Sequence, residues 1–230
     1  QVQAQASLAS GLAVHQQGQL AEARACYLQV LKLQPRHFDA LHLLGVIAAQ
    51  TKNFAQALEL FDQAIKINAG HAFAFNNRGN VLRDLGQPAA AIANYDQAIR
   101  LKADYAEAFN SRGNAWMDLA KPQDALQSYD KAIAVKADYA EAHTNRGNAL
   151  LALMQPEAAI TSHDRAIALK ADYAEAYNNR GAAFKALKQF SAAVSSYDQA
   201  IACNANYAQA WYNRANALVA LKQLATALES

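Results

Sequence analysis

The chain repeats itself every 34 residues from residue 4 onward, without a single insertion or deletion. Repeats 1 to 7 begin at Ala4, Phe38, Ala72, Ala106, Ala140, Ala174 and Ala208, and the seventh stops at its position 23, Ser230. Positions below are counted within a repeat. A fixed period of this length is typical of a linear array in which each repeat packs only on its neighbours. We therefore expect residues 1–230 to form one array.

Each repeat contains two stretches with the spacing of an amphipathic helix. In repeat 4, apolar or small residues stand at positions 3, 4, 8 and 11 and again at positions 20, 21, 24, 27 and 28. The first group is Ala108, Phe109, Gly113 and Trp116, and the second is Ala125, Leu126, Tyr129, Ala132 and Ile133. The sequence thus predicts an all-α fold of antiparallel helix pairs.

Proline and acidic residues mark the expected helix starts. Proline at position 17 stands where the first turn of the second helix should begin, because its missing N–H has no intrahelical partner there. These residues are Pro88, Pro122 and Pro156. Aspartate at position 33 precedes by three residues a glutamate at position 2 of the next repeat, the spacing of a capping box. These pairs are Asp104 with Glu107, Asp138 with Glu141 and Asp172 with Glu175.

The composition excludes several classes of protein. Formal net charge is +2, and lysine and arginine alternate with acidic residues rather than cluster, so we expect no nucleic-acid partner. No apolar run is long enough to cross a membrane, and no secretory signal pattern opens the chain. These observations favour the cytoplasm.

Small residues at two positions give the repeat a resemblance. Position 8 is Gly11, Gly45, Gly79, Gly113, Gly147, Gly181 and finally Ala215; position 20 is Ala23, Ala57, Ala91, Ala125, Ala159, Ala193 and Ala227. With an aromatic residue at position 24, this pattern resembles the tetratricopeptide repeat. The resemblance implies a right-handed α-solenoid, a superhelix whose first helices line a concave groove.

The chain departs from that family at two positions. The proline at position 32 survives only as Pro35, and alanine replaces it in the five later repeats. The turns between repeats are therefore expected to be less firmly held, which leaves helix fusion or swapping open. Arginine replaces the usual leucine at position 7 from repeat 3 onward.

The arginines match aspartates 16 residues upstream. Pairing position 25 of one repeat with position 7 of the next uses every member of both sets. The predicted pairs are Asp62–Arg78, Asp96–Arg112, Asp130–Arg146, Asp164–Arg180 and Asp198–Arg214. Because the second helix of one repeat packs on the first helix of the next, we expect structural ion pairs between repeats. The alternative is an arginine row that binds anionic ligands.

Asparagines flank these arginines on another face of the first helix. Positions 2, 6, 9 and 13 lie on one stripe at helical spacing, called the amide stripe below. Its asparagines are Asn77, Asn80, Asn114, Asn145, Asn148, Asn179, Asn213 and Asn216. A primary amide both donates and accepts hydrogen bonds, which suits the peptide groups of an extended polypeptide. The alternative is that these amides only bond neighbouring backbone or water.

Two functions follow from the resemblance. The first is a scaffold that binds a protein or peptide in its groove. The second is the substrate-recognition region of a larger glycosyltransferase, because the amide rows resemble those of the O-linked N-acetylglucosamine transferases. The chaperone-tail carboxylate clamp of the family does not fit, since position 5 carries no lysine and position 2 carries glutamates.

No residue pattern predicts catalysis, a metal site or a cofactor. The chain lacks a phosphate loop and a nucleophile elbow. Of the closely spaced His37, Asp39 and His42, the last two are expected on one helix, whereas His37 precedes it. We expect His143 and His163 to serve in packing. By itself the chain is expected not to be an enzyme.

The two ends of the array carry apolar surface. In repeat 7 the residues around Trp211 and Leu218 lack most of a second helix to cover them, so we expect self-association there. At the other end, the stripe positions hold Leu12, Leu43 and Val46. This apolar patch is either a contact surface or a surface that residues 1–3 cover.

Overall fold

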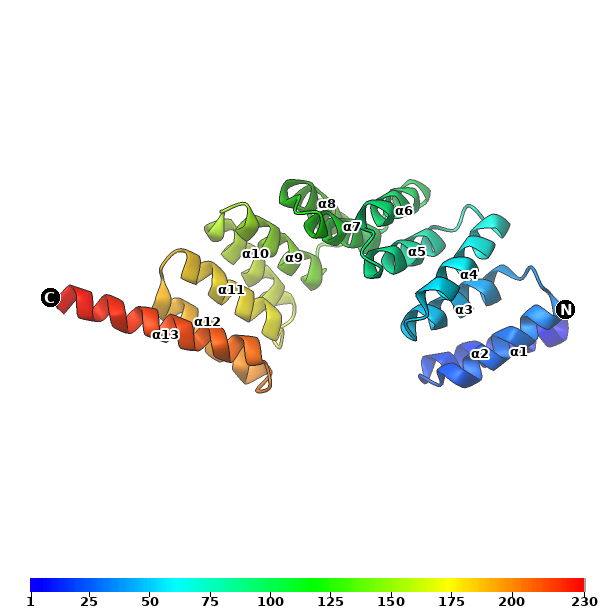
Figure 1. Ribbon diagram of the computed structural model, residues 1–230, viewed down its shortest axis with the longest axis horizontal. Coiled ribbons are helices and arrows are strands. Elements are labelled where there is room, and N and C mark those ends of the chain that lie inside the picture. Colours follow the sequence, from blue (N-terminus) through cyan, green and yellow to red (C-terminus); the bar gives the residue numbers. More distant parts are fainter. Residues whose placement is uncertain (230) are drawn as a thin grey trace. The chain divides into compact units, whose positions relative to one another are not determined.

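Helices make up the regular structure in residues 1–229, which the computed structural model describes, with side chains described through residue 222 (Figure 1). They are α1 (Val2–Gln16), α2 (Leu20–Leu33), α3 (Phe38–Gln50), α4 (Phe54–Ile67), α5 (Ala72–Asp84), α6 (Pro88–Leu101), α7 (Ala106–Asp118), α8 (Pro122–Val135), α9 (Ala140–Ala152), α10 (Pro156–Leu169), α11 (Ala174–Ala186), α12 (Phe190–Cys203) and α13 (Ala208–Glu229). The all-α fold of helix pairs is confirmed.

The contacts divide the chain into two bodies, residues 1–115 and residues 116–230. In the first body α1 packs on α2, α3 on α4 and α5 on α6, and α2 and α4 each pack on the first helix of the next repeat. In the second body the same scheme joins α8 to α9, α9 to α10, α10 to α11 and α11 to α12. Each body therefore buries its apolar stripes between neighbouring helix pairs.

Glycine at position 8 allows the paired helices to approach closely. A Cβ added to Gly79 would lie 2.7 Å from Cε1 of Tyr95, and one added to Gly181 would lie 2.5 Å from Cε1 of Tyr197. Both rings stand at position 24 and are fully buried. In repeat 7, where alanine replaces glycine, Ala215 is exposed. The glycine is therefore required where an aromatic ring of the second helix lies against the first.

A left-handed residue at position 15 closes the turn inside each of the first six repeats. The N–H of position 15 donates to the carbonyl of position 12, and that of position 16 to position 11, as in a Schellman motif. The left-handed residues are Gly18, Lys52, Gly86, Ala120, Met154 and Lys188, with φ between 55° and 78°. Four of them are not glycine, and each costs about 1–2 kcal/mol of backbone strain. We infer that packing of the second helix on the first offsets this backbone strain.

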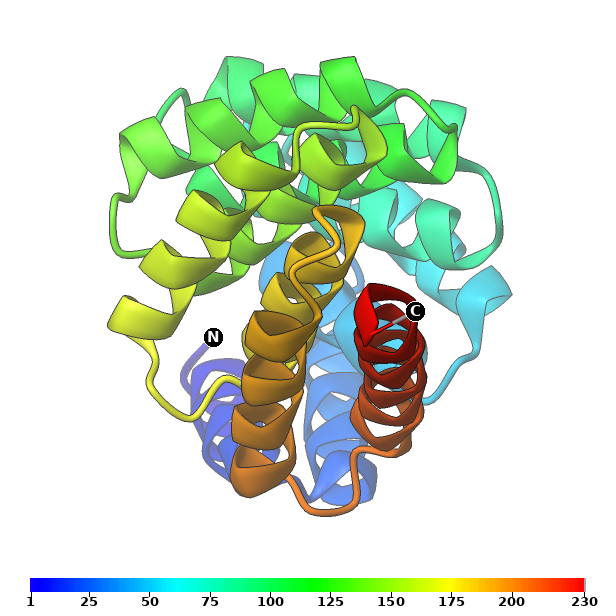
Figure 2. The ribbon, with the colours of Figure 1, turned by 90° about the vertical axis from the view of Figure 1, so that its left-hand side faces the viewer.

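Repeat 7 differs from the expectation of two separate helices. There α13 runs without a turn from Ala208 to Glu229, past Lys222 at position 15 (Figure 1). Residues 221–223 read LKQ, the same three residues that form the turn at 187–189 in repeat 6, so the local sequence alone does not account for the continuous helix. The first part of α13 packs beside α12, as Figure 2 also shows. Ala227 lies outside the side chains that the structure describes.

The turns between repeats hold although their proline is replaced. For example, α4 ends at Ile67 and α5 begins at Ala72, and α6 ends at Leu101 before α7 begins at Ala106. Within the described residues the helices therefore do not fuse at position 32, a possibility that the sequence leaves open, and the continuous helix α13 passes through position 15 instead. Neighbouring repeats pack tightly enough to end these helices without proline.

The helix starts agree with one prediction and correct another. Pro88, Pro122 and Pro156 occupy the first turns of α6, α8 and α10, as the sequence predicts. The capping box is wrong for α9 and α11, whose N-caps are Tyr139 and Tyr173 without a side-chain hydrogen bond. The aspartates thus stand one residue too early to cap, because the helix begins after the tyrosine of position 34.

Candidate functional site

Each arginine of position 7 reaches from a first helix to the second helix of the preceding repeat. Arg78 Nε lies 2.8 Å from Asp62 Oδ1, and Arg146 Nε lies 2.7 Å from Asp130 Oδ1. The equivalent contacts join Arg112 to Asp96, Arg180 to Asp164 and Arg214 to Asp198. Each pair lies within a single body and joins two neighbouring repeats of that body.

A second partner, at position 23, was missed in the sequence. Arg78 also donates from Nη1 to Asn94 Oδ1 at 3.2 Å, and Arg146 donates from Nη1 to Ser162 Oγ at 2.6 Å. Arg180 likewise donates to Ser196. The guanidinium therefore bridges three helices. The sequence held the signal, because polar residues occupy position 23 from repeat 3 onward, whereas repeat 2 pairs Leu44 at position 7 with Leu60 at position 23.

The arginines are the more buried members of these pairs. Their side chains are 21–33% exposed, against 39–51% for the aspartates. A partly solvated pair of this kind contributes about 0.2–1 kcal/mol. Because the N–H donors of a guanidinium lie in one rigid plane, each contact restricts the orientation of the arginine relative to its partner as well as the distance between them. We interpret the network as a device that aligns neighbouring repeats, in which two donor atoms of Arg78, Arg146 and Arg180 already bond to protein groups.

The first body places three of the predicted asparagines on the amide stripe. Asn77 Nδ2 lies 3.1 Å from Nε2 of His42, and Asn80 Oδ1 accepts from the hydroxyl of Tyr95 at 2.8 Å. Both asparagines line a cavity of about 110 Å³. Its other lining residues are Val46, Ala49, Phe61, Val81 and Asp84. The third, Asn114, is partly exposed on α7. The stripe here thus combines amides with a small apolar hollow.

The second body places the other five on α9, α11 and α13. Asn213 Nδ2 donates to Asn178 Oδ1 at 2.9 Å, and Asn178 Nδ2 donates to Asn179 Oδ1 at 3.1 Å. Asn178, at position 5, is buried, whereas Asn145, Asn148, Asn179 and Asn213 are partly exposed and Asn216 is exposed. Asn178 therefore links Asn179 to Asn213, and the five stripe asparagines of this body keep part of their surface accessible to solvent.

His163 interrupts the pattern in repeat 5. It occupies the aromatic position 24, is fully buried, and neither ring nitrogen has a hydrogen-bond partner. Burial lowers the pKa of His163 to about 4, with Asp164 raising it and Arg180 lowering it. In repeat 3 the tyrosine at this position donates to the asparagine of position 9. The side-chain amide of its counterpart Asn148 makes no hydrogen bond to any residue that the structure describes, so this amide is free for a ligand.

Two histidines of the first body pack together beside the stripe. The rings of His42 and His71 lie 5.4 Å apart, and Phe38 stacks on His42 at 5.8 Å. Burial and the neighbouring His71 lower the pKa of His42 to about 4, against a raising effect of Asp39. The neutral ring that results suits the contact with Asn77. His37 instead accepts the N–H of Ala40 at the start of α3.

The apolar end of the stripe is open. Leu12 is exposed and Leu43 and Val46 are partly exposed. Val2 belongs to α1 and is exposed, so it does not cover this surface. Within the described residues, no group of three or more His, Cys, Asp or Glu side chains is placed to hold a metal ion. Nor is any described helix long and apolar enough to cross a membrane.

Comparison with known families decides the identity of the repeat. A tetratricopeptide repeat family matches residues 3–72 and 144–206, more than half of the chain. The chain belongs to the tetratricopeptide repeat family. Two further families of the same repeat match residues 79–119 with 121–153, and residues 196–229. A comparison with curated protein sequences gives no match.

Solved structures of tetratricopeptide proteins share the fold. The Cut9–Hcn1 assembly of APC/C matches with a TM-score of 0.82 and 18% identity over 94% of this chain and 43% of that one. PilF of Pseudomonas aeruginosa matches with a TM-score of 0.80 and 18% identity, over 93% and 97%. YrrB, described as having an unusual peptide-binding site, matches with a TM-score of 0.64 and 18% identity, over 81% and 96%. At these identities the likeness concerns the fold alone.

Proposed function

We propose that this tetratricopeptide protein is a scaffold that holds an extended polypeptide along the amide stripe. The observation that carries the proposal is the row of partly or fully exposed asparagines at positions 6 and 9, of which Asn148 has no hydrogen-bond partner for its side-chain amide among the described residues. Such amides can donate to and accept from successive peptide groups without reading side chains. The peptide-binding site named for YrrB shows that a relative in fold binds peptides. We expect weak sequence preference.

Removing two amides from one helix tests this proposal. The variant Asn145→Ala/Asn148→Ala should weaken binding of a permanently unfolded probe, reduced and S-alkylated lysozyme, by about tenfold, since two hydrogen bonds of about 0.5–1.5 kcal/mol each are lost. Fluorescence anisotropy gives the affinity, and circular dichroism checks that helicity is kept. Thr161→Ala on α10, away from the stripe, is the control. Unchanged binding would leave the asparagines with a structural role only.

A second candidate places the stripe in a larger enzyme. The same amides would then hold substrate protein for a glycosyltransferase domain of the O-linked N-acetylglucosamine transferase type. The regular presence of asparagine at positions 6 and 9 favours it. The sequence that follows residue 230 in the parent reading frame distinguishes the two, because a transferase domain there supports the second candidate.

We also propose that α13 mediates self-association. Trp211, Tyr212 and Val219 of α13 are 49%, 64% and 56% exposed. Large apolar side chains exposed together on one helix are typical of an interaction surface. Light scattering should show mass rising with protein concentration, and Trp211→Ser/Val219→Ser should reduce that rise. A strict monomer at high concentration would contradict this proposal.

A further inference from the structure

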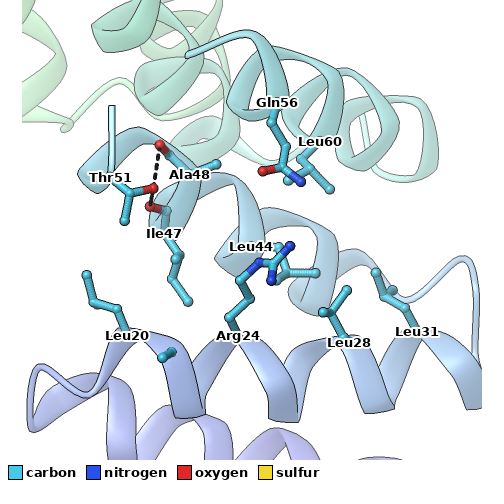
Figure 3. Close-up of a pocket in the computed structure, with 11 residues that line it drawn as sticks. Leu20, Arg24, Leu28, Leu31, Leu44, Ile47, Ala48, Thr51, Gln56 and Leu60 are labelled. Atoms are coloured by element: carbon cyan, nitrogen blue, oxygen red, sulfur yellow. Dashed lines mark hydrogen bonds between the residues drawn. The ribbon is translucent and has the colours of Figure 1, made fainter. Parts of the chain in front are cut away.

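The junction between repeats 1 and 2 replaces the polar network with leucines. Leu28 at position 25, Leu44 at position 7 and Leu60 at position 23 are the counterparts of Asp62, Arg78 and Asn94. Where the polar residues bridge three helices in the later repeats, the leucines leave a cavity of about 420 Å³ between α2, α3 and α4 (Figure 3). This volume lies in the range of ligand-binding pockets.

The pocket is an apolar trough that opens to solvent. Leu20, Leu28 and Leu31 line it from α2, and Leu44 and Ile47 from α3 (Figure 3). Leu28 is 38% exposed. From Leu20 to Leu31 the α2 side extends about 16 Å at the rise of an α-helix. The trough therefore offers room for several apolar side chains in a row, while one side of any occupant stays in water.

The polar groups at the pocket offer hydrogen-bond donors. Arg24 extends from α2 toward α3 (Figure 3) and makes no hydrogen bond or ion pair with any described residue. Gln56, on α4, accepts a hydrogen bond at Oε1 from Asn53 Nδ2 at 3.0 Å. Its Nε2 hydrogens are therefore available to donate to a ligand. The Thr51 hydroxyl donates to the carbonyl of Ile47. No carboxylate lines the pocket, so it presents an unmatched positive charge beside apolar walls.

We propose that this pocket docks an amphipathic α-helix of a partner protein that carries apolar residues on one face and a carboxylate beside them. The apolar face fills the trough, and the carboxylate pairs with Arg24 and accepts from Gln56. Because the pocket opens to solvent beside Leu28, the occupant needs a polar outer face of its own, which a helix has and a free acyl chain lacks. The pocket residues of α3 and its C-cap Thr51 stand at positions 7, 10, 11 and 14, so this site is separate from the amide stripe.

A designed peptide tests the proposal on the whole chain. The probe is a fluorescein-labelled, alanine-rich peptide of about 20 residues, longer than the roughly 12–15 residues below which an isolated helix is marginal in water, with leucine at i, i+3, i+4 and i+7 and glutamate beside them. It should bind, and Leu28→Asp/Leu44→Arg/Leu60→Asn should weaken it by at least about tenfold, because that triple variant installs the network of the next junction in place of the pocket. The same three residue types already fold together there, as Asp62, Arg78 and Asn94.

Charge reversal provides the second test. Arg24→Glu, an exposed change that leaves the fold intact, should weaken the acidic peptide about fivefold and favour a peptide with lysine in place of glutamate. Binding that neither variant changes, or no binding of the acidic peptide, would overturn the proposal. Binding of dodecanoate without binding of the peptide would also overturn it, and would make the pocket an acyl-chain site. The Asn145→Ala/Asn148→Ala variant, which should lose affinity for unfolded lysozyme, should bind the acidic helical peptide as tightly as the wild type does.

Discussion

Replacing Gly181 with valine should destabilise the protein by about 3 kcal/mol, at the upper end of overpacking costs. The added Cβ alone would lie 2.5 Å from Cε1 and 2.8 Å from Cδ1 of Tyr197. That ring is fully buried, so neither it nor the backbone of α11 can move away without separating α11 from α12. The free energy of unfolding, measured by urea titration, checks this result.

Position 8 of repeat 7 supplies the matched control. Ala215→Val changes the same position on an exposed surface, where only the lower helix propensity of valine counts, at under about 1 kcal/mol. Combining Gly181→Val with Tyr197→Ala should cost less than the sum of the two single changes, because the second change removes the ring that the valine meets. Equal losses for Gly181→Val and Ala215→Val would show that close helix approach does not explain the glycine.

Replacing His163 with phenylalanine should stabilise the protein, and more strongly in acid. At pH 7 the gain is about 1–3 kcal/mol, because two buried ring nitrogens without partners are removed. The folded state keeps the pKa of His163 at about 4, below its ordinary value of 6.5. The unfolded chain therefore takes up a proton first, so the wild type loses stability as pH falls from about 6.5 to about 4, by about 3 kcal/mol in total.

The difference between variant and wild type isolates this histidine. His42 titrates in the same range and remains in both proteins, so its contribution cancels. The stability advantage of His163→Phe should thus grow between pH 6.5 and 4 and level off below. His163→Tyr should behave similarly, with its hydroxyl placed to donate to Asn148 as Tyr95 does to Asn80. A difference independent of pH would contradict a buried neutral His163.

Much of the fold can be predicted from the sequence because the same residue types recur at the packing positions of each repeat. Glycine at position 8 opposite an aromatic residue at position 24 specifies a close helix pair, and the 16-residue spacing of Asp62 and Arg78 identifies which helices meet across repeats. The capping box failed because a spacing alone does not say where a helix begins, and one residue of offset removes the bond. The continuity of α13 depends on packing that local sequence does not report.

The candidate site, too, could be predicted only in part. The positions of the asparagines follow from helical periodicity, whereas their partners do not, since Asn77 contacts His42 of the preceding repeat and Asn80 contacts Tyr95 of its own. The pocket at the first junction was missed for another reason. Leu28 and Leu44 stand where later junctions carry an aspartate and an arginine, and the shape of the pocket they line depends on three helices at once.

We propose that the asparagine amides of the amide stripe bind the partner polypeptide, whereas the arginines of position 7 align neighbouring repeats. A ¹H–¹⁵N NMR titration of the whole chain with reduced, S-alkylated lysozyme observes both groups in one spectrum. We expect the side-chain amide signals of Asn145 and Asn148 to shift on binding and the Nε–H signal of Arg146, held by Asp130, to stay in place. Shifts of the arginine signals with unmoved asparagine amides would contradict the account.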